Sequence, residues 1–308
     1  MKILILGGHG FVGRSVNKLL QEKNIEPIYI ISRRDGVDLT NYKQMYEIFK
    51  KVSPGVILNL AAHGGSLHYV TEYAADVIHD NIQMSLNIYK AVKECCPNAR
   101  IINPISNCSY PGDSSIQKEE EWLNGPVHDS VLSYGNYKRF LYVISKCYHM
   151  QYKIDTVNIL IPNTYGPGDS TDPNKTHALN GMIIRMIKAK RNRDKEFEIW
   201  GTGKPVREWA YITDVAKMIT TVIDYPEPII YPVNCAQNKG YSIRESAEMI
   251  KEAIQFTGSL RFNTNYQDGA PIKILDDHRF RKLFPDFKFY DHKKGINETV
   301  KYYEKELS

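Results

Sequence analysis

Short apolar runs alternate with longer amphipathic stretches through the first half of the chain. The apolar runs, which predict β-strands, cover 2–6, 27–31, 56–60, 100–105 and 156–160. The amphipathic stretches, which predict helices, cover 11–21, 42–51, a long segment that ends near residue 96, and 131–152. Strands that alternate with helices need crossover connections, and these produce a parallel sheet with helices on both faces. The pattern therefore predicts an α/β fold with a doubly wound parallel sheet.

This alternation ends near residue 162. A loop rich in Gly, Pro, Asp and Asn follows at 163–175, and a helical stretch that includes 182–190 comes next. Doubly wound folds bind ligands at the carboxyl ends of their strands, so we expect a smaller α/β region to cover that edge. We predict a first domain at 1–162 and a substrate-binding region at 163–308. Within this region, 203–232 is expected to return to the first domain, because 211–223 has a helical pattern.

Composition and charge narrow the possible functions. Of the 308 residues, 42% are hydrophobic and 24% are charged, which is ordinary for a packed protein. The 40 basic and 35 acidic residues are dispersed, so we expect no nucleic-acid partner. The N-terminal apolar run is too short for a signal peptide, and no segment approaches the roughly 18 apolar residues of a membrane span. The five cysteines lack the spacing of a metal site or a disulfide framework. We therefore predict a cytoplasmic protein with no membrane partner and no metal.

The segment GGHGFVG directly follows the first predicted strand and opens the first predicted helix. It places Gly7, Gly10 and Gly13 at a spacing that permits a tight turn and a close approach of backbone to a ligand. A pyrophosphate bound there would lie at the positive end of the helix. Because a second strand follows the helix, this motif predicts a dinucleotide site of the Rossmann type.

The end of the second predicted strand indicates which dinucleotide binds. An NAD-specific enzyme usually carries an acidic residue there, whereas this chain has Arg33 and Arg34. Two guanidinium groups suit a 2′-phosphate, which favours NADP(H). Asp35 or Asp38 could still reach a ribose or an adenine, so NAD stays open at this point.

Three residues have the chemistry of a carbonyl reductase. Tyr134 and Lys138 lie one turn apart on a predicted helix, so their side chains share a face. A free phenol has a pKa of about 10. A neighbouring ammonium, helped by the positive nicotinamide of the oxidised cofactor, is expected to favour the phenolate of Tyr134 and bring its proton equilibrium into a useful range. Ser106 follows the fourth predicted strand, where its hydroxyl can hydrogen-bond a substrate carbonyl. We predict that these three residues form a catalytic triad.

Motifs along almost the whole chain resemble those of the GDP-L-fucose synthases, which are extended short-chain dehydrogenases/reductases. They are GGHGFVG, AAHGG at 61–65, SNCSYP at 106–111, YGNYK at 134–138, PNTYGPGD at 162–169, WGTGKPVRE at 200–208 and DGAPIKILD at 268–276. Enzymes of that family epimerise C3 and C5 of a GDP-4-keto-6-deoxy-sugar and then reduce C4 with NADPH. The resemblance implies the same reaction, the same cofactor and a homodimer.

Carried over by position, the resemblance implies roles for individual residues. Ser106, Tyr134 and Lys138 would form the reductase triad, and Cys108 with His177 would be the base and acid of epimerisation. A C4 carbonyl acidifies the protons at C3 and C5, so a thiolate and an imidazole can exchange them through an enolate. The cofactor would contact Tyr134 and Lys138 and also Gly7, Gly10, Phe11, Val12, Gly13, Arg33, Arg34, Asp38, Leu39, Ala61 and Ala62. The substrate would contact Asn163, Arg185, Trp200, Lys204, Arg207 and Lys273.

The sequence also departs from the family. Asn107 replaces the usual second serine, Pro104 lies within a predicted strand, and Gly181 lies in the helix that usually shapes the sugar pocket. These departures leave the sugar open, including another hexose or a heptose. Two alternative enzymes remain, a C4-reductase on another GDP- or NDP-keto-sugar and an epimerase without net redox change. A non-catalytic redox sensor would have little reason to keep the whole triad.

Overall fold

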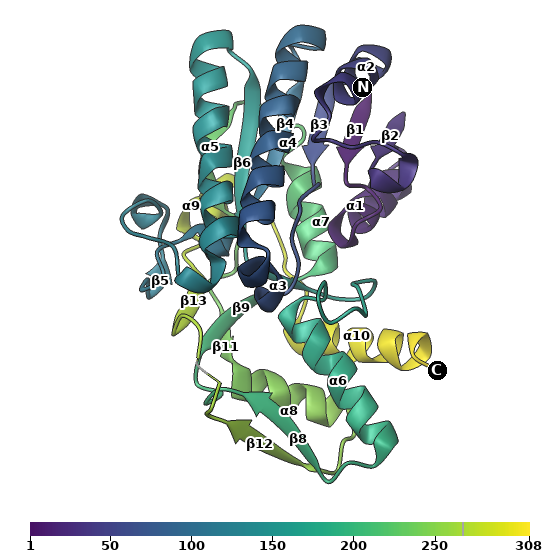
Figure 1. The fold of residues 1–308 in the computed structure, drawn as a ribbon, viewed down its shortest axis with the longest axis vertical. Helices are drawn as coiled ribbons and strands as arrows, with labels where there is room; N and C mark the ends of the chain where they lie inside the picture. Colours follow the sequence, from purple (N-terminus) through teal and green to yellow (C-terminus); the bar gives the residue numbers. More distant parts are fainter. Residues whose placement is uncertain (267) are drawn as a thin grey trace.

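A six-stranded parallel sheet forms one end of the molecule (Figure 1). The computed structural model describes residues 1–266 and 268–308. The strand order is β10-β6-β4-β3-β1-β2, and every pairing in it is parallel. These strands are β1 (Ile3–Leu6), β2 (Ile28–Ile31), β3 (Val56–Asn59), β4 (Arg100–Ser106), β6 (Asp155–Ile161) and β10 (Ile229–Asn234). The chain runs outward from β1 in both directions, which confirms the predicted doubly wound sheet.

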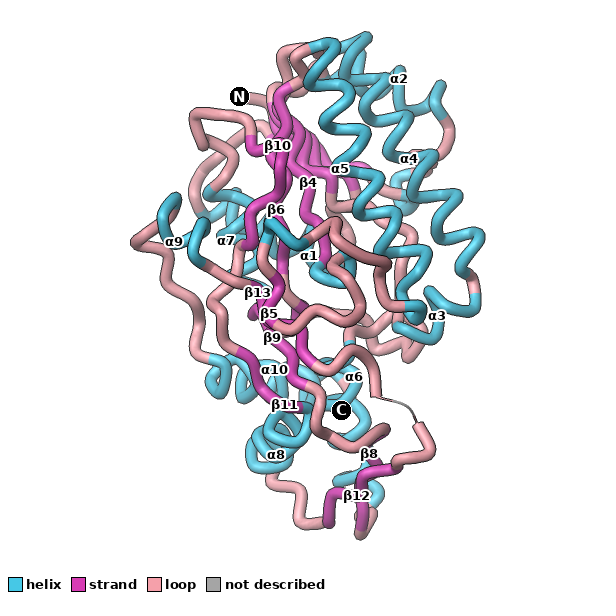
Figure 2. Tube along the Cα trace, turned by 90° about the vertical axis from the view of Figure 1, so that its left-hand side faces the viewer, coloured by secondary structure: helices cyan, strands magenta, loops and turns pink. Residues whose placement is uncertain are grey.

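Helices cover both faces of this sheet, as Figure 2 shows with the sheet nearly edge-on. One layer holds α2 (Tyr42–Val52), α4 (Ala74–Cys95) and α5 (Leu132–Tyr152). The other holds α1 (Phe11–Glu22), α7 (Ile212–Thr221) and α9 (His278–Leu283). Successive residues of β1 point to opposite faces, so Leu4 and Leu6 pack in the first layer and Ile3 and Ile5 in the second. Burial on both faces explains why the strands read as continuous apolar runs.

A second, smaller region lies beyond the carboxyl ends of these strands. Its five-stranded sheet contains β5 (Ile116–Gln117), β7 (Asn163–Tyr165), β9 (Val206–Tyr211), β11 (Gly240–Ser242) and β13 (Ile272–Leu275). A separate pair joins β8 (Glu196–Trp200) to β12 (Ser259–Asn263). The helices α6 (Ala178–Asn192), α8 (Ile243–Ile254) and α10 (His292–Glu306) pack with these strands around a core of their own.

The chain crosses between the two regions several times. Within the stretch expected to return to the first domain, α7 packs against α1 and β10 joins the six-stranded sheet, whereas β9 lies in the second sheet. Conversely, β5 comes from the first half of the chain and pairs with β13. Phe280 of α9 also belongs to the core of the six-stranded sheet. The two regions are therefore joined by packed segments as well as by the chain at residue 162.

Asparagine side chains cross the interior of the six-stranded sheet. Asn59 of β3 donates to Asn103 Oδ1 at 2.9 Å, and Asn103 in turn donates to Asn158 Oδ1 of β6 at 3.0 Å. Asn158 Nδ2 then donates to Ser145 Oγ of α5 at 2.9 Å. All four side chains are buried, and their hydrogen bonds satisfy polar groups that would otherwise be costly. This asparagine ladder ties β3, β4 and β6 to the helix that carries Tyr134.

In the part of the chain that the structure describes, every helix is too short or too polar to cross a bilayer. The same residues bring together no group of three or more His, Cys, Asp or Glu side chains that could hold a metal ion. The cysteines at 95, 96, 108, 147 and 235 are free thiols.

Candidate active site

A glycine turn joins β1 to α1 at the carboxyl edge of the sheet. Gly10 N donates to Gly7 O at 2.9 Å, and a Cβ at Gly13 would overlap that same carbonyl oxygen. Among residues 1–266 and 268–308, no side chain caps α1, and its first turn has no acidic residue. Free N–H groups at a positive helix end suit a pyrophosphate. This turn therefore fits the diphosphate of a dinucleotide.

The other residues predicted to contact the cofactor surround this turn. Phe11 and Val12 begin α1, and the Phe11 ring lies 5.4 Å from the His177 ring. Ala61 follows β3, and a Cβ added at Gly7 would lie 2.8 Å from Ala61 Cα, so these two strand ends are in close contact. Ala62 comes next in the chain. The structure thus brings the predicted residues from β1, α1 and β3 to one edge.

Arg33 and Arg34 begin η1 (Arg33–Asp35), a short 3₁₀ helix directly after β2. Arg34 N donates to Ser32 Oγ at 3.1 Å, which fixes the turn, while Arg33 Nη2 lies 3.5 Å from Asp80 Oδ2 of α4. Both arginines are exposed. They therefore stand at the open end of the strand where a 2′-phosphate would lie.

Asp38 and Leu39 follow this turn and have mainly local partners. Asp38 Oδ1 accepts hydrogen bonds from Thr40 N at 3.0 Å and Thr40 Oγ1 at 2.8 Å. Leu39 is buried, and its carbonyl accepts a hydrogen bond from Asn87 of α4. These contacts hold the segment after β2 against the sheet, beside the arginine pair.

Tyr134 and Lys138 project from the first turns of α5 toward the end of β4. The Lys138 Nζ atom lies 5.5 Å from the centre of the Tyr134 ring and donates to Pro104 O at 2.9 Å. Lys138 is almost fully buried. Ser106 ends β4 two residues after Pro104. The predicted triad residues therefore gather at one strand end, on the same carboxyl edge of the sheet as the glycine turn.

Pro104 is compatible with its central strand because the neighbouring strand has already ended. Arg100 N donates to Gly55 O on the β3 side, and alternation places the backbone of Pro104 on the same side. The paired register between β3 and β4 stops at Leu58 and Ile102. Proline thus removes no ladder hydrogen bond here, and its carbonyl is free to accept the Lys138 ammonium.

Burial dominates the ionisation of Tyr134 and Lys138. It raises the pKa of the Tyr134 phenol far above its ordinary value, with smaller contributions from Tyr137 and Cys108. It also lowers the pKa of Lys138 to about 8, against the opposing effect of Cys108. Desolvation of the phenolate is the dominant effect in this structure and favours the protonated phenol. The prediction that Lys138 and a positive nicotinamide together favour the phenolate concerns the complex with oxidised cofactor, and it stays a prediction.

Cys108 lies on η2 (Asn107–Ser109), between the triad and the second sheet. Its backbone N–H donates to Ser106 Oγ at 3.4 Å. The thiol also lies close enough to raise the pKa of Lys273 on β13, although burial lowers that pKa overall. Cys108 therefore faces groups from both regions.

His177 is held as the cap of α6 by a buried carboxylate. Its Nδ1 atom lies 3.0 Å from Asp169 Oδ2, and its backbone N–H donates to the same oxygen at 2.8 Å. Burial tends to raise the pKa of Asp169, but the hydrogen bonds from His177 and Asn180 lower it overall. A charged Asp169 orients the imidazole and leaves Nε2 for a ligand. The described contacts include no hydrogen bond between His177 and Cys108.

Arg207 and Lys273 are direct neighbours on adjacent parallel strands, β9 and β13. Residues paired in this way project from the same face of a sheet. Burial lowers the pKa of Arg207 to about 10, while the carboxylate of Asp268 acts in the opposite direction. Two partly desolvated cations on one face would be stabilised by an anionic ligand.

The other residues predicted to contact the substrate lie around this pair. The Arg185 guanidinium stacks 5.0 Å from the Trp200 ring, and Trp200 stacks on Tyr266 at 4.9 Å. Trp200 remains 56% exposed, although Arg185 and Tyr266 both contact its ring. Asn163 Nδ2 donates to Glu208 O at 3.1 Å, and Lys204 is exposed in the turn after β8.

Several residues around the site were missed by sequence reasoning. Asp80 contacts Arg33, and Tyr266 completes the stack with Trp200. Asn81 Nδ2 donates to His63 O at 2.7 Å and fixes the AAHGG segment. Arg139 contacts the loop that carries Cys108. Only its position directly after Lys138 in the sequence could have drawn attention to Arg139.

Comparisons with known proteins agree with the resemblance found in the motifs. The family model described as "NAD dependent epimerase/dehydratase family" matches residues 3–234. The GDP-L-fucose synthase of Dictyostelium discoideum is 28% identical over 98% of this chain and 94% of that protein. A probable GDP-L-fucose synthase of Drosophila melanogaster is 29% identical over 98% of this chain and 97% of that protein. The crystal structure of a GDP-L-fucose synthetase from Naegleria fowleri bound to NADP has a TM-score of 0.89 at 26% identity, covering 99% of this chain and 93% of that one. The resemblance is thereby confirmed.

Proposed function

Because this chain belongs to the NAD-dependent epimerase/dehydratase family, we propose that it is an NADPH-dependent epimerase/reductase that acts on a GDP-4-keto-6-deoxy-sugar. The observation that carries this proposal is that Tyr134, Lys138 and Ser106 share the carboxyl edge of the sheet with the glycine turn, while Cys108 from the same segment lies near Lys273 of the cation pair. NADP(H) is the cofactor that the sequence and its relatives support.

The reductive half uses groups at the end of β4. NADPH, when bound, supplies the hydride for C4 of the sugar. The Ser106 hydroxyl orients the C4 carbonyl, and Tyr134 donates a proton to its oxygen. The raised pKa of Tyr134 suits reduction, because it keeps the phenol protonated until the carbonyl oxygen gains negative charge. Lys138, fixed by Pro104 O, then stabilises the phenolate that remains.

The epimerase half uses Cys108 and His177. The Cys108 thiolate removes the proton at C3 or C5, and the His177 Nε2–H group returns one on the other face of the enolate. The contact between His177 Nδ1 and Asp169 orients the imidazole and leaves its Nε2 atom for proton transfer. Lys273 lies near Cys108 and places a cation beside the site of deprotonation.

Arg207, Lys273 and Arg185 would bind the diphosphate, because paired cations match its charge. Trp200, which remains 56% exposed, would contact the guanine base, and Asn163 would contact the sugar. The test is to supply a panel of GDP- and other nucleotide-linked 4-keto-sugars with NADPH in D₂O. We expect NADPH oxidation with deuterium at C3 and C5 of the product.

Reduction without deuterium at either carbon would leave a simple C4-reductase. Deuterium incorporation without consumption of NADPH would indicate an epimerase. A protein that binds NADPH but transforms no sugar of the panel would contradict the proposed enzyme class. Product analysis by NMR distinguishes these outcomes in one experiment.

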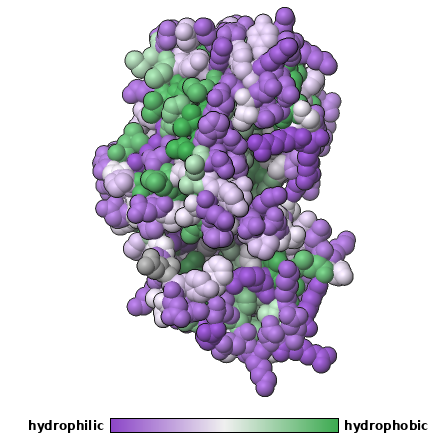
Figure 3. Space-filling view, in the orientation of Figure 1, coloured by the Kyte–Doolittle hydropathy of each residue, from purple (hydrophilic) through white to green (hydrophobic). Residues whose placement is uncertain are grey.

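The predicted homodimer is supported by one exposed face of α4 and α5. Val143, Cys147 and Met150 form a stripe on α5, and Leu86 is exposed on α4. Figure 3 shows apolar residues gathered on this face of the molecule. The test is light scattering of Val143→Glu/Met150→Glu against wild type, with Lys146→Glu as the control on the same helix. We expect the double variant to be monomeric, and an unchanged mass would contradict this interface.

The predicted cytoplasmic location remains a proposal. Cys147 is an exposed free thiol, and a reducing compartment would keep it in that state. Fractionation of cells that express the chain, with immunoblotting, tests this location.

A further inference from the structure

The guanidinium of Arg139 is bound entirely by backbone carbonyls. Its Nε atom donates to Ser109 O at 2.7 Å, Nη1 to Gly125 O at 2.6 Å and Nη2 to Trp122 O at 3.0 Å. The described contacts give it no carboxylate partner. A planar donor with a fixed geometry is suited to hold several acceptors at once. Arg139 therefore fastens both ends of the loop at 109–125 to α5.

A second contact holds the start of the same loop. Trp122 Nε1 donates to Ser109 Oγ at 2.8 Å, and Ser109 Oγ donates to Ser106 O at 2.7 Å. Ser109 and Trp122 are fully buried. This chain of hydrogen bonds connects the anchored loop to the backbone of the predicted catalytic serine.

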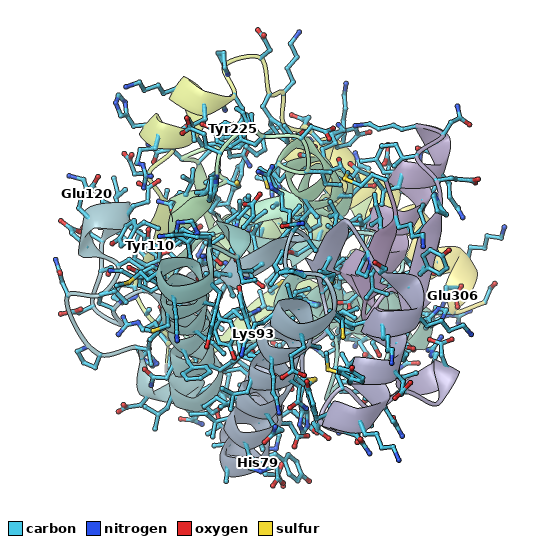
Figure 4. All side chains as sticks on the ribbon, turned by 90° about the horizontal axis from the view of Figure 1, so that it is seen from above. His79, Lys93, Tyr110, Glu120, Tyr225 and Glu306 are labelled. Carbon is cyan, nitrogen blue, oxygen red and sulfur yellow. The ribbon has the colours of Figure 1, made fainter. Side chains whose placement is uncertain are left out.

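The loop approaches α5 closely at Cys108. A Cβ at Gly135 would lie 2.8 Å from Cys108 O, so the helix accepts this carbonyl only because residue 135 is a glycine. Figure 4 shows Tyr110 and Glu120 from this segment beside α5. The segment with Ser106 and Cys108 is thus bracketed by successive residues of one helix, with Lys138 bound to Pro104 O and Arg139 to Ser109 O.

We propose that Arg139 is a positioning residue that sets the geometry of Ser106 and Cys108 relative to Tyr134. This inference rests on the proposed function, since it assigns those residues to the reaction. Replacing the guanidinium by a side chain without donors would leave three carbonyls without their partner. The loop would then lose its attachment to the helix that carries the phenol. Binding of NADPH at the glycine turn would not change.

The test compares Arg139→Met with Arg139→Lys, and Lys146→Met serves as the matched control, because Lys146 is an exposed cation on the same helix. We expect Arg139→Met to lower kcat of C4 reduction at least about tenfold, with the Kd of NADPH within about twofold of wild type. Arg139→Lys should recover part of the activity, and Lys146→Met should behave as wild type. A wild-type kcat in Arg139→Met would overturn the proposal.

A second readout needs no substrate. In a Cys147→Ser background, peptide-resolved alkylation with iodoacetamide measures the reactivity of Cys108, with Cys95 as internal reference. Arg139→Met should change the Cys108 rate several-fold and leave the Cys95 rate unchanged. If the proposed function is wrong, the wild-type protein will be inactive on every sugar. The alkylation rate of Cys108 would still show whether Arg139 positions the loop. Equal Cys108 rates in Arg139→Met and wild type would overturn the positioning role.

Arg139→Met could also unfold the protein, so Ser109→Ala provides a milder variant. It removes the oxygen that joins Trp122 to Ser106 and changes little volume. We expect a lower kcat with unchanged NADPH binding. A loss of thermal stability in Ser109→Ala with full kcat would show that these contacts are merely structural.

Discussion

The turn between β1 and α1 and the strand pair β9–β13 are both built for anions, but by different means. The turn uses backbone N–H groups within one short segment at Gly7 to Gly13. The strand pair uses the charged side chains of Arg207 and Lys273, which are 66 positions apart in the sequence. The first site depends on local conformation, and the second depends on the register of two strands.

The two sites also differ in electrostatic cost. A helix end carries a partial charge that needs no desolvation of a side chain. Burial of Arg207 and Lys273, by contrast, lowers the pKa of both side chains. Burying the charges of Arg207 and Lys273 is therefore most costly without a bound anion. A bound diphosphate would lower this electrostatic cost. The comparison teaches that the cofactor site depends mainly on shape, whereas the substrate site depends on charge.

Tyr134 lies between the two sites, and its replacement should have the largest effect. Tyr134→Phe removes the proton donor and leaves the ring in place, so kcat for reduction should fall at least about a hundredfold. Binding at both sites should persist, as measured by NADPH fluorescence and GDP calorimetry. A variant with near wild-type turnover would mean that another group protonates the C4 oxygen.

A methyl group at Gly13 should damage only the turn. In Gly13→Ala, the new Cβ would overlap Gly7 O and the backbone of Gly8. The overlap would displace the backbone N–H groups that receive the pyrophosphate, so NADPH should bind at least about tenfold more weakly. Fluorescence titration measures this change, and calorimetry with GDP should show unchanged binding. An equal loss of GDP affinity would mean that the two sites are not independent.

The arginine pair after β2 should set the choice of cofactor. A lost charge-assisted contact costs about 1.5 to 3 kcal/mol, so Arg33→Ala/Arg34→Ala should weaken NADPH binding more than about tenfold. The affinity for NADH should stay nearly constant, because it lacks the 2′-phosphate. If the wild-type protein bound NADPH and NADH equally well, the assignment of Arg33 and Arg34 to the 2′-phosphate would be wrong.

A change in the cation pair should affect the substrate site and leave the cofactor site intact, which is the opposite of the Gly13→Ala result. Lys273→Met keeps the aliphatic length and removes the charge, so KM for the GDP-sugar should rise about tenfold. Its NADPH affinity should match that of wild type in steady-state kinetics and titration. Lys188→Met is the matched control, because Lys188 is an exposed cation on α6 with no predicted substrate contact, and its KM should equal that of wild type. If Lys273→Met changed the affinity for NADPH and left KM for the GDP-sugar unchanged, Lys273 would belong to the cofactor site and the prediction would be wrong.

His292 should give a smaller and pH-dependent effect in the substrate region. Burial lowers the pKa of His292 from 6.5 to about 4, so the unfolded chain binds more protons between these values. The stability that this shift contributes to the folded state is fully present above pH 6.5 and is lost as pH falls toward 4. His292→Phe should therefore flatten the dependence of unfolding free energy on pH in this window, measured with urea. The control His68→Gln, at an exposed position, should keep the wild-type dependence of unfolding free energy on pH. An unaltered slope in His292→Phe would contradict the prediction.

The sequence predicted the sheet well because its signals are local. The apolar runs and the glycine turn each lie within a few residues, and the structure confirms the doubly wound fold that the alternating pattern predicted. The pairing of β5 with β13 depends on tertiary contacts, so no local pattern indicated it. The same holds for Arg139, whose acceptors are backbone carbonyls and have no sequence signature. The upward effect of burial on the pKa of Tyr134 could not be predicted, because burial is not visible in a YxxxK pattern.

The asparagine ladder has a consequence for how this protein can change over generations. Asn59, Asn103 and Asn158 each serve as partner to the next, so an apolar replacement at one position would strand an amide at another. A single substitution would thus be costly, while replacement of all three together by apolar residues could be nearly neutral. Homologues should therefore keep the three amides as a group or lose them as a group, and intermediates should be rare.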